Sequence, residues 1–576
     1  MINNSLLRRK IKSIIFFGRM LLIWYIVALS IFATLGVDAT DLDDYVWKPD
    51  NAYGWTFMGE DTNIHGKSLT GGRSWTGYVL NYTSQRWLTD DEFTEDSEVK
   101  SLWWHYLVIV VPDDIHWTAN ASLYITGGTN SAGIPAAKDE DIVLAASIAM
   151  GTGTITGALF QVPNQHMKFT SDPLQINRNE GSILTFGWDH FLNDTSKPEW
   201  IGELANVKAS TWAMTAMTEF VASRPDFGCN LESFTVLGAS KRGWATWLTA
   251  AVDTLDRVKL IIPVVLDAIN FAAVEHHEWR SYGGWSFALE DYYNSNIMVR
   301  YDTPAMTLLQ ENIDAFWYRD RLTMPKFIIN AVLDEFQQPD DSNYWWRDMT
   351  GPKHFLMTPN ADHSEATGLL EITPAMGTWI NYHLRGRADE VPEFTWEISN
   401  STGEIIATLD DKGNVFEASM WYAYSCGNNS DGINRRDFRL SSLDVPCECG
   451  VFSDGYCVNR NSWWTQVPLE VKVSAEGKRI YSSQMDTPTD GRYVAHLIEI
   501  KYKESIHPHA SFPMDTGAEM LLKDTTKPKR DLTGFKIPDF PWDMPGRLVF
   551  TTQVSVWPNS FPYEDCYLDS CAGTLL

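Results

Sequence analysis

A short apolar run leads into a helical pattern through Thr235-Val236-Leu237-Gly238-Ala239-Ser240-Lys241-Arg242-Gly243-Trp244. The apolar residues before the glycine predict a buried strand, and a helix is predicted to begin at Lys241. A serine between such elements is typical of a nucleophile elbow, a tight turn that lifts the hydroxyl above the sheet. The usual pattern is G-x-S-x-G, whereas here Arg242 holds the last position and Gly243 follows it. The alternative is an ordinary junction in which Ser240 caps the helix.

Two further polar residues follow predicted strands. Asp334 comes directly after one apolar run, and His363 lies in the loop after the next predicted strand. Functional groups in α/β sheets gather at these carboxyl ends. The order Ser240, Asp334, His363 predicts a catalytic triad in which His363 takes the serine proton and Asp334 orients the ring. Asp267, also at a strand end, is the second candidate for the acid. Taken singly, Asp334 also fits a helix N-cap and His363 a polar loop residue.

Unalternating apolar strands are interleaved with helical segments in the first two thirds of the chain. The runs 234–237, 258–266 and 326–333 carry no polar alternation, which indicates burial on both faces of a parallel sheet. An amphipathic helix is predicted over 201–223. Together with the order of the triad residues, this predicts an α/β fold for residues 40–385, an α/β-hydrolase-like doubly wound sheet.

Backbone N–H groups for an oxyanion hole are expected from two places. The first is the start of the helix beyond the serine, at Lys241. The second is the glycine pair after the predicted strand 122–126, where Gly128 lets the backbone approach a substrate. Because Gly-Gly turns are common in loops, the glycine pair by itself does not indicate an oxyanion hole.

The segment 268–324 reads as an insertion rich in aromatic residues. It is predicted to cap the site and line a substrate pocket, with Trp285 contributing from the insertion and Arg242 and Trp244 from the helix after the serine. The alternative is that the insertion packs as ordinary helices onto the sheet. Arg242 and Lys241 either face an acidic substrate or pair with surface acids.

Motifs for metals and cofactors are incomplete. Glu275-His276-His277-Glu278 resembles a zinc-protease helix but has serine at position 281 instead of the second histidine. The glycine-rich stretch 151–157 lacks the dinucleotide-binding spacing, and no phosphate-binding loop of the Walker type is present. The sequence therefore predicts no metal and no cofactor.

The pattern changes after about residue 385. Short alternating runs separated by turns, including 394–398, 416–424 and 493–502, predict a separate all-β, sandwich-like domain over 386–576. Six of the seven cysteines fall in this region, where they indicate disulfides whose pairing the spacing leaves open. Cys229 is predicted to be a buried thiol. The six are Cys426, Cys447, Cys449, Cys457, Cys566 and Cys571.

The N-terminus indicates export. A basic segment precedes the apolar run 20–37, and small residues at Val37 and Ala39 predict a signal peptide over 1–39; an uncleaved anchor is the alternative. The sequence therefore predicts a secreted protein with no membrane attachment after cleavage. Glycosylation sequons begin at Asn81, Asn120, Asn193, Asn400 and Asn428, which agrees with export. The net charge of −28 excludes nucleic acid as a partner.

Four stretches of the sequence, 83–87, 125–130, 238–244 and 360–363, resemble the PhoPQ-activated pathogenicity-related protein family, which includes proliferation repressors of social amoebae. The resemblance spans roughly residues 42–560. The family implies an α/β-hydrolase-like fold with a serine nucleophile, carried here by Ser240. A more distant similarity is to glucuronoyl esterases, whose elbow also has a basic residue after the serine.

Two functions follow as hypotheses. The first is a secreted serine hydrolase that cleaves an ester- or peptide-containing substrate through an acyl-enzyme. The second is a secreted signalling protein that uses the hydrolase scaffold to bind a cell-surface receptor.

Overall fold

A computed structural model describes residues 39–67, 73–410, 412–426, 432–443, 447, 449–453, 455–460, 462–503 and 547–576. Except for Ala39, the predicted signal peptide lies outside these residues, so its cleavage stays a prediction. No helix within the described ranges is long and apolar enough to cross a bilayer.

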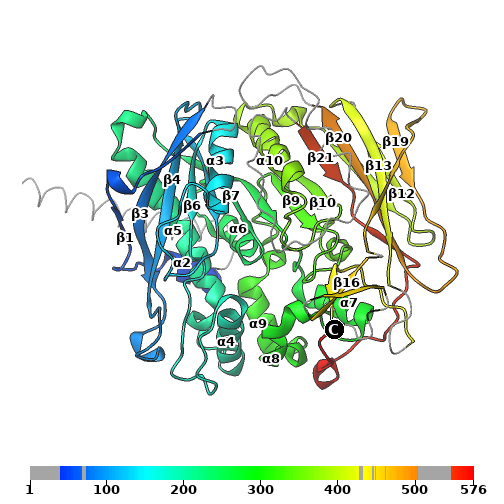
Figure 1. Cartoon of the computed structure of the whole chain (residues 1–576), viewed down its shortest axis with the longest axis horizontal. Coiled ribbons are helices and arrows are strands. Elements are labelled where there is room, and N and C mark those ends of the chain that lie inside the picture. Colours follow the sequence, from blue (N-terminus) through cyan, green and yellow to red (C-terminus); the bar gives the residue numbers. More distant parts are fainter. Residues whose placement is uncertain are drawn as a thin grey trace, which may run out of the picture.

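A ten-stranded sheet forms the first part of the molecule (Figure 1). Its order is β1-β3-β4-β6-β5-β7-β8-β9-β10, with β2 paired to β3. The strands from β6 to β10 run parallel, whereas β4 is antiparallel to both of its neighbours. The strands are β1 Gly54–Phe57, β2 Ile64–Lys67, β3 Ser74–Arg86, β4 Leu102–Pro112, β5 Asn120–Ile125, β6 Ile155–Leu159, β7 Ser233–Ala239, β8 Val258–Val264, β9 Lys326–Ala331 and β10 Lys353–Thr358.

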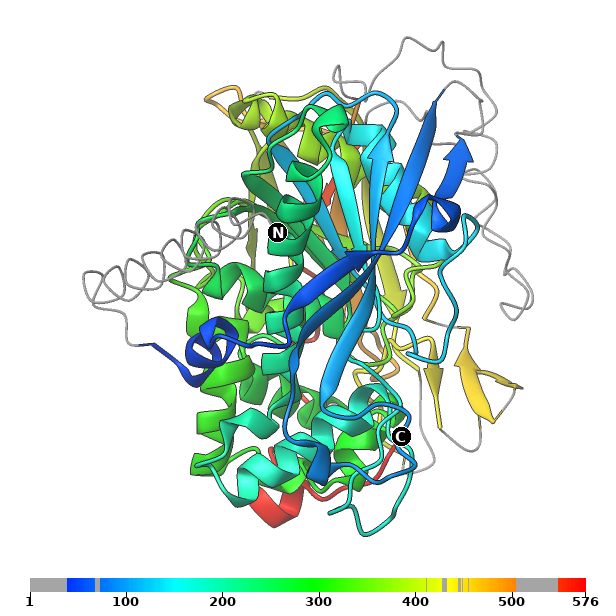
Figure 2. The same cartoon turned by 90° about the vertical axis from the view of Figure 1, so that its left-hand side faces the viewer.

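Helices cover both faces of this sheet, which accounts for the unalternating apolar strands. The core on one face includes α3 and α10, and the core on the other face includes α5 and α6. Figure 2 views the molecule from the side of β1 and β3. The predicted α/β-hydrolase-like fold is confirmed. The helices are α2 Asp41–Trp47, α3 Glu140–Thr152, α4 Glu180–Asn193, α5 Gly202–Ala222, α6 Lys241–Val252, α7 Phe271–Tyr282, α8 Glu290–Asn294, α9 Pro304–Ile313 and α10 Leu369–Leu384.

The sequence pattern over residues 139–224 predicts mainly helices, so it does not predict one central strand. β6 (Ile155–Leu159) lies in this region, buried at every position between β4 and β5. Its sequence contains Gly157 and Ala158, which have low strand propensity, and burial on both faces removes any alternation. A Cβ atom at Gly157 would lie 2.5 Å from the sulfur of Met217, so glycine lets α5 approach the strand closely.

The region after residue 393 forms three antiparallel sheets beyond α10 (Figure 1). Their orders are β11-β12-β19-β18, then β17-β13-β20-β21 with β22 on β20, and β14-β16-β15. The sequence also predicts a strand over 469–473, of which only Lys472–Val473 forms one, β18. The strands are β11 Phe394–Ile398, β12 Ile405–Leu409, β13 Val415–Tyr424, β14 Ser441–Ser442, β15 Gly450–Ser453, β16 Tyr456–Asn459, β17 Thr465–Pro468, β18 Lys472–Val473, β19 Arg479–Ser483, β20 Val494–Lys503, β21 Arg547–Thr551 and β22 Ser555–Trp557.

The six cysteines after residue 385 form disulfides, as the sequence predicts. Cys426 bonds to Cys449 and Cys447 bonds to Cys457, and both pairs hold the small sheet β14-β16-β15. A third disulfide, Cys566 to Cys571, lies in the C-terminal tail. Cys229 is a free thiol, but it is half-buried rather than buried.

Candidate active site

The turn between β7 and α6 holds Ser240 in an unusual backbone conformation. Its φ is 56° and its ψ is −127°, a region that residues other than glycine rarely adopt. A Cβ atom at Gly238 would lie 2.7 Å from the carbonyl oxygen of Arg242, so the turn closes only with glycine there. A Cβ atom at Gly243 would lie 2.8 Å from the carbonyl oxygen of Val264 in β8. The glycine displaced by one position from the usual pattern therefore lets α6 cross closely over β8.

Of the three predicted triad residues, His363 lies within hydrogen-bonding distance of both Ser240 and Asp334. Nε2 of His363 is 2.8 Å from the Ser240 Oγ atom. Nδ1 of His363 is 2.9 and 2.8 Å from the two carboxylate oxygens of Asp334. A buried carboxylate accepts hydrogen bonds, so the Nδ1 proton points to Asp334 and leaves Nε2 free to accept the serine proton.

Asp334 is itself held in place by its own loop. Its Oδ1 atom accepts hydrogen bonds from the backbone N–H groups of Phe336 at 2.7 Å and Gln337 at 3.3 Å. The second candidate for the acid has a different partner. Asp267 accepts a hydrogen bond from Nε1 of Trp345 at 2.5 Å, and burial raises its pKa well above the ordinary value. Asp334, and not Asp267, is therefore the carboxylate bonded to His363.

An aromatic ring and two further ionisable groups surround His363. The Phe336 ring centroid is 4.3 Å from that of His363, and the Lys241 ammonium is 5.6 Å from the Phe336 centroid. Burial lowers the pKa of Lys241. Burial raises the pKa of Glu335 to about 8, and the negative charge of Asp334 adds to this effect. Sequence reasoning missed Glu335, although its position next to the predicted acid was a signal.

The predicted oxyanion donors follow two neighbouring strands, β7 and β5. Lys241 is the first residue of α6, so its N–H has no intrahelical acceptor. Gly128 follows β5, which pairs with β7 up to Gly238. Gly128 has a φ of 111°, which requires glycine.

Arg242 packs against this loop. A Cβ atom at Gly127 would lie 2.5 Å from the Arg242 guanidinium, so the side chain packs directly against the loop. Arg242 donates to the carbonyl of Val162 and to Glu180, both at 2.5 Å. Burial opposes ionisation of Glu180, but the guanidinium outweighs it and keeps the pKa of Glu180 below its ordinary value. The Nε and Nη2 groups of Arg242 are thus engaged within the protein, and its contact with a substrate stays a prediction. Sequence reasoning missed Glu180.

Both tryptophans of the predicted substrate pocket belong to the core. Trp244 is 4% exposed, and its Nε1 donates to the carbonyl of Ile313. Trp285 is fully buried, and its Nε1 donates to the carbonyl of Cys571 at 2.8 Å. Neither ring offers a surface to a substrate, so these two predictions are corrected. The insertion holds the C-terminal tail with Trp285, which also pairs its backbone with Thr574.

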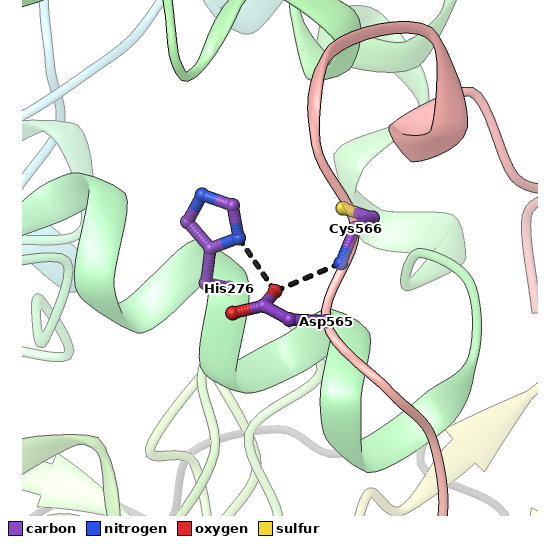
Figure 3. Close-up of side chains that lie close together, drawn as sticks. All are labelled: His276, Asp565 and Cys566. Atoms are coloured by element: carbon purple, nitrogen blue, oxygen red, sulfur yellow. Dashed lines mark hydrogen bonds and ion pairs between the residues drawn. The ribbon is translucent and has the colours of Figure 1, made fainter.

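One group of side chains in the described part of the chain has the geometry of a metal site: His276, Asp565 and Cys566 (Figure 3). The Cys566 sulfur is bonded to Cys571. Nδ1 of His276 is 2.8 Å from Asp565, and its Nε2 is 3.0 Å from Asp302. Because its donor atoms already have partners, the cluster serves as a clamp between α7 and the tail.

Comparisons with known proteins match this chain to a family. Residues 42–439 match the family described as PhoPQ-activated pathogenicity-related protein. The chain is 30% identical over 550 residues to autocrine proliferation repressor protein A of Dictyostelium discoideum, an alignment covering 94% of this chain and 95% of that protein.

Solved structures with a similar fold include two acetyl xylan esterases. The one from Paenibacillus sp. is 14% identical, and the match covers 59% of this chain and 95% of that one, with a TM-score of 0.35. The one from Thermoanaerobacterium sp. is 13% identical, with coverage of 56% and 88% and a TM-score of 0.35.

Proposed function

The chain belongs to the PhoPQ-activated pathogenicity-related protein family, and from the geometry of its site we propose that it is a serine hydrolase. It cleaves an ester or peptide bond through an acyl-enzyme. The observation that carries the proposal is the hydrogen-bonded series Ser240–His363–Asp334 on a serine whose φ is 56°. A strained backbone at one reactive serine, aligned with a base and a buried acid, is a costly arrangement that a purely structural role does not need.

In the proposed reaction the Ser240 oxygen forms a bond to the substrate carbonyl carbon while its proton passes to Nε2 of His363. The carbonyl oxygen gains negative charge and receives hydrogen bonds from the N–H groups of Lys241 and Gly128. The imidazolium then gives its proton to the leaving group, and the acyl-enzyme remains. Water repeats the sequence, with His363 as base, and restores the serine hydroxyl.

A fluorescent fluorophosphonate, which phosphonylates activated serines, tests this proposal. We expect the folded wild-type protein to be labelled and the Ser240→Ala variant to be unlabelled. Ser474→Ala, which changes a serine in a turn of the C-terminal region, is the matched control and should be labelled like the wild type. Failure to label a folded wild-type sample would overturn the proposal. A screen of ester and peptide substrates then identifies the bond that is cleaved.

A second candidate is a signalling role. The chain is similar over almost its whole length to a Dictyostelium protein whose name describes a repressor of proliferation. In that case the hydrolase scaffold would bind a cell-surface receptor, and the serine would be dispensable. The two candidates differ in one result. A Ser240→Ala protein that still represses proliferation supports signalling, whereas loss of the effect with retained folding supports hydrolysis.

The proposed site of action is outside the cell. Three disulfides in the described residues suit an oxidising compartment. The sequon residues Asn81, Asn193 and Asn400 are exposed. Asn120 is half-buried and donates to Ser233 at 2.6 Å, so it is the least accessible of the described four. Asn428 lies outside the described residues.

A further inference from the structure

Two loops that carry triad residues are in contact with the C-terminal region. The backbone N–H of Leu440 donates to the carbonyl of Leu333 at 3.1 Å, immediately before Asp334. The N–H of Leu333 in turn donates to the carbonyl of Ala361 at 3.0 Å, two residues before His363. One series of backbone hydrogen bonds therefore runs from the C-terminal region through the acid loop to the base loop.

The base loop has a second and more specific attachment through Asn360. Its side-chain oxygen accepts a hydrogen bond from the backbone N–H of Trp464 at 2.7 Å. Its side-chain nitrogen donates to the carbonyl of Trp464 at 3.1 Å. A primary amide that engages both backbone groups of one residue imitates a strand pairing, which sets both the distance and the orientation of the loop.

The backbone of Asn360 explains why asparagine suits this place. Its φ is 58°, a left-handed conformation that asparagine tolerates better than most residues do. Glycine would also adopt this conformation, but it has no amide to pair with Trp464. Glycine at position 360 would therefore keep the turn and remove the attachment to Trp464.

The attachment point is itself held firmly. Trp464 is 3% exposed. The backbone N–H of Asn459, the last residue of β16, donates to the carbonyl of Leu440 at 2.8 Å. Two disulfides, Cys426–Cys449 and Cys447–Cys457, cross-link the small sheet that contains β16. Trp464 lies between β16, whose sheet carries these disulfides, and β17, which pairs with β13.

We propose that this part of the C-terminal region completes the active site, and that Asn360 is a positioning residue that places His363 through Trp464. The inference rests on the proposed hydrolase function. Neither Asn360 nor Trp464 bonds to Ser240, His363 or Asp334, so their effect passes through the backbone of the base loop. The hydrolase sheet supplies the triad, and the C-terminal region sets its alignment.

The experiment compares Asn360→Gly with Asn343→Gly in the full-length protein. Asn343 also joins the two parts of the chain, since its side chain contacts Gln553 at 2.9 Å and Val554 at 3.3 Å, but neither contact involves the base loop. Both variants lose one bridging amide. The readouts are the maximal rate of fluorophosphonate labelling (kinact), the inhibitor constant (KI) and hydrogen exchange of residues 359–367.

We expect Asn360→Gly to lower kinact about tenfold or more while KI stays the same, because small misplacements of a catalytic base are costly. Asn343→Gly should leave both constants near the wild-type values. Equal kinact in Asn360→Gly and the wild type would overturn the proposal. If the wild type is not labelled, the hydrolase function fails, and hydrogen exchange decides the positioning role separately. Faster exchange of 359–367 in Asn360→Gly then supports it, and unchanged exchange rejects it.

Discussion

Nε2 of His363 lies 2.8 Å from Oγ of Ser240, although 123 residues separate them along the chain. The two loops that carry them follow β7 and β10, with β8 and β9 between these strands in the sheet. Asp334 follows β9 and reaches the far side of the imidazole. The distance between the serine and the histidine therefore depends on how the loop after β10 is folded and held.

Asp334→Asn should keep the fold and lose most of the reactivity of Ser240. The amide is the same size as the carboxyl but does not stabilise the imidazolium, and it favours the wrong tautomer of His363. We expect the rate of fluorophosphonate labelling to fall by about 10³- to 10⁴-fold.

Asp267→Asn is the matched control for the choice of acid. Burial raises the pKa of Asp267 well above its ordinary value, and asparagine keeps the size and shape of the side chain. Labelling should stay within about twofold of the wild type, because Asp267 bonds to Trp345 and not to His363. Equal losses in the two variants would contradict the assignment of Asp334.

Arg242→Met should slow the reaction without removing a reacting group. The guanidinium supports Gly127 and the carbonyl of Val162, so its loss loosens the loop that carries Gly128. We expect kinact to fall by roughly 10- to 100-fold. Measuring Glu180→Gln and the double variant completes a cycle. The effects of the two substitutions on kinact should be far from additive, because Glu180 acts through Arg242. Additive effects would show that the two residues act independently.

Gly238→Ala should destabilise the protein. The added methyl group would meet the backbone carbonyl of Arg242 at 2.7 Å, and backbone cannot move aside as a flexible side chain does. We expect a loss of about 1–3 kcal/mol in the free energy of unfolding, measured by denaturant titration.

Gly377→Ala provides the opposite case. Gly377 lies inside α10, and no atom lies within 4 Å of its added Cβ position. Alanine there should stabilise the protein by about 0.5–1 kcal/mol, since it favours the helix. If both variants change stability alike, the close approach at the elbow is not what requires glycine.

Glu335→Gln should change how stability depends on pH. The carboxyl of Glu335 has an ordinary pKa of 4.5 and a pKa of about 8 in the folded protein. Between these values the folded state binds more protons than the unfolded state, so the stability from this group is full below 4.5 and is lost as the pH rises through 8.

The measurement for Glu335 is the Tm from pH 5 to pH 8.5. The Tm of Glu335→Gln should fall less over this range than that of the wild type. Glu470→Gln, at an exposed position, is the control and should follow the wild-type curve. Parallel curves for Glu335→Gln and the wild type would show that the group titrates alike in both states.

Local patterns in the sequence were enough to predict several strands of the sheet and the polar residues that follow them. Apolar runs without alternation predicted β7, β8 and β9, and polar residues at their ends predicted Ser240 and Asp334. This works because strand burial and strand termination depend on neighbouring residues. β6 was missed because glycine and alanine weaken its local signal, and its burial comes from contacts with distant segments.

The sequence by itself determined the elbow, the order of the triad residues and the change to β-rich structure near residue 385. Only the tertiary structure decided the direction and partners of individual side chains. It turned Trp244 and Trp285 into the core, paired Arg242 with Glu180, matched the cysteines and joined Asn360 to Trp464. The physical reason is that a side chain's direction follows from packing between segments far apart in the chain, and residue spacing does not contain that information.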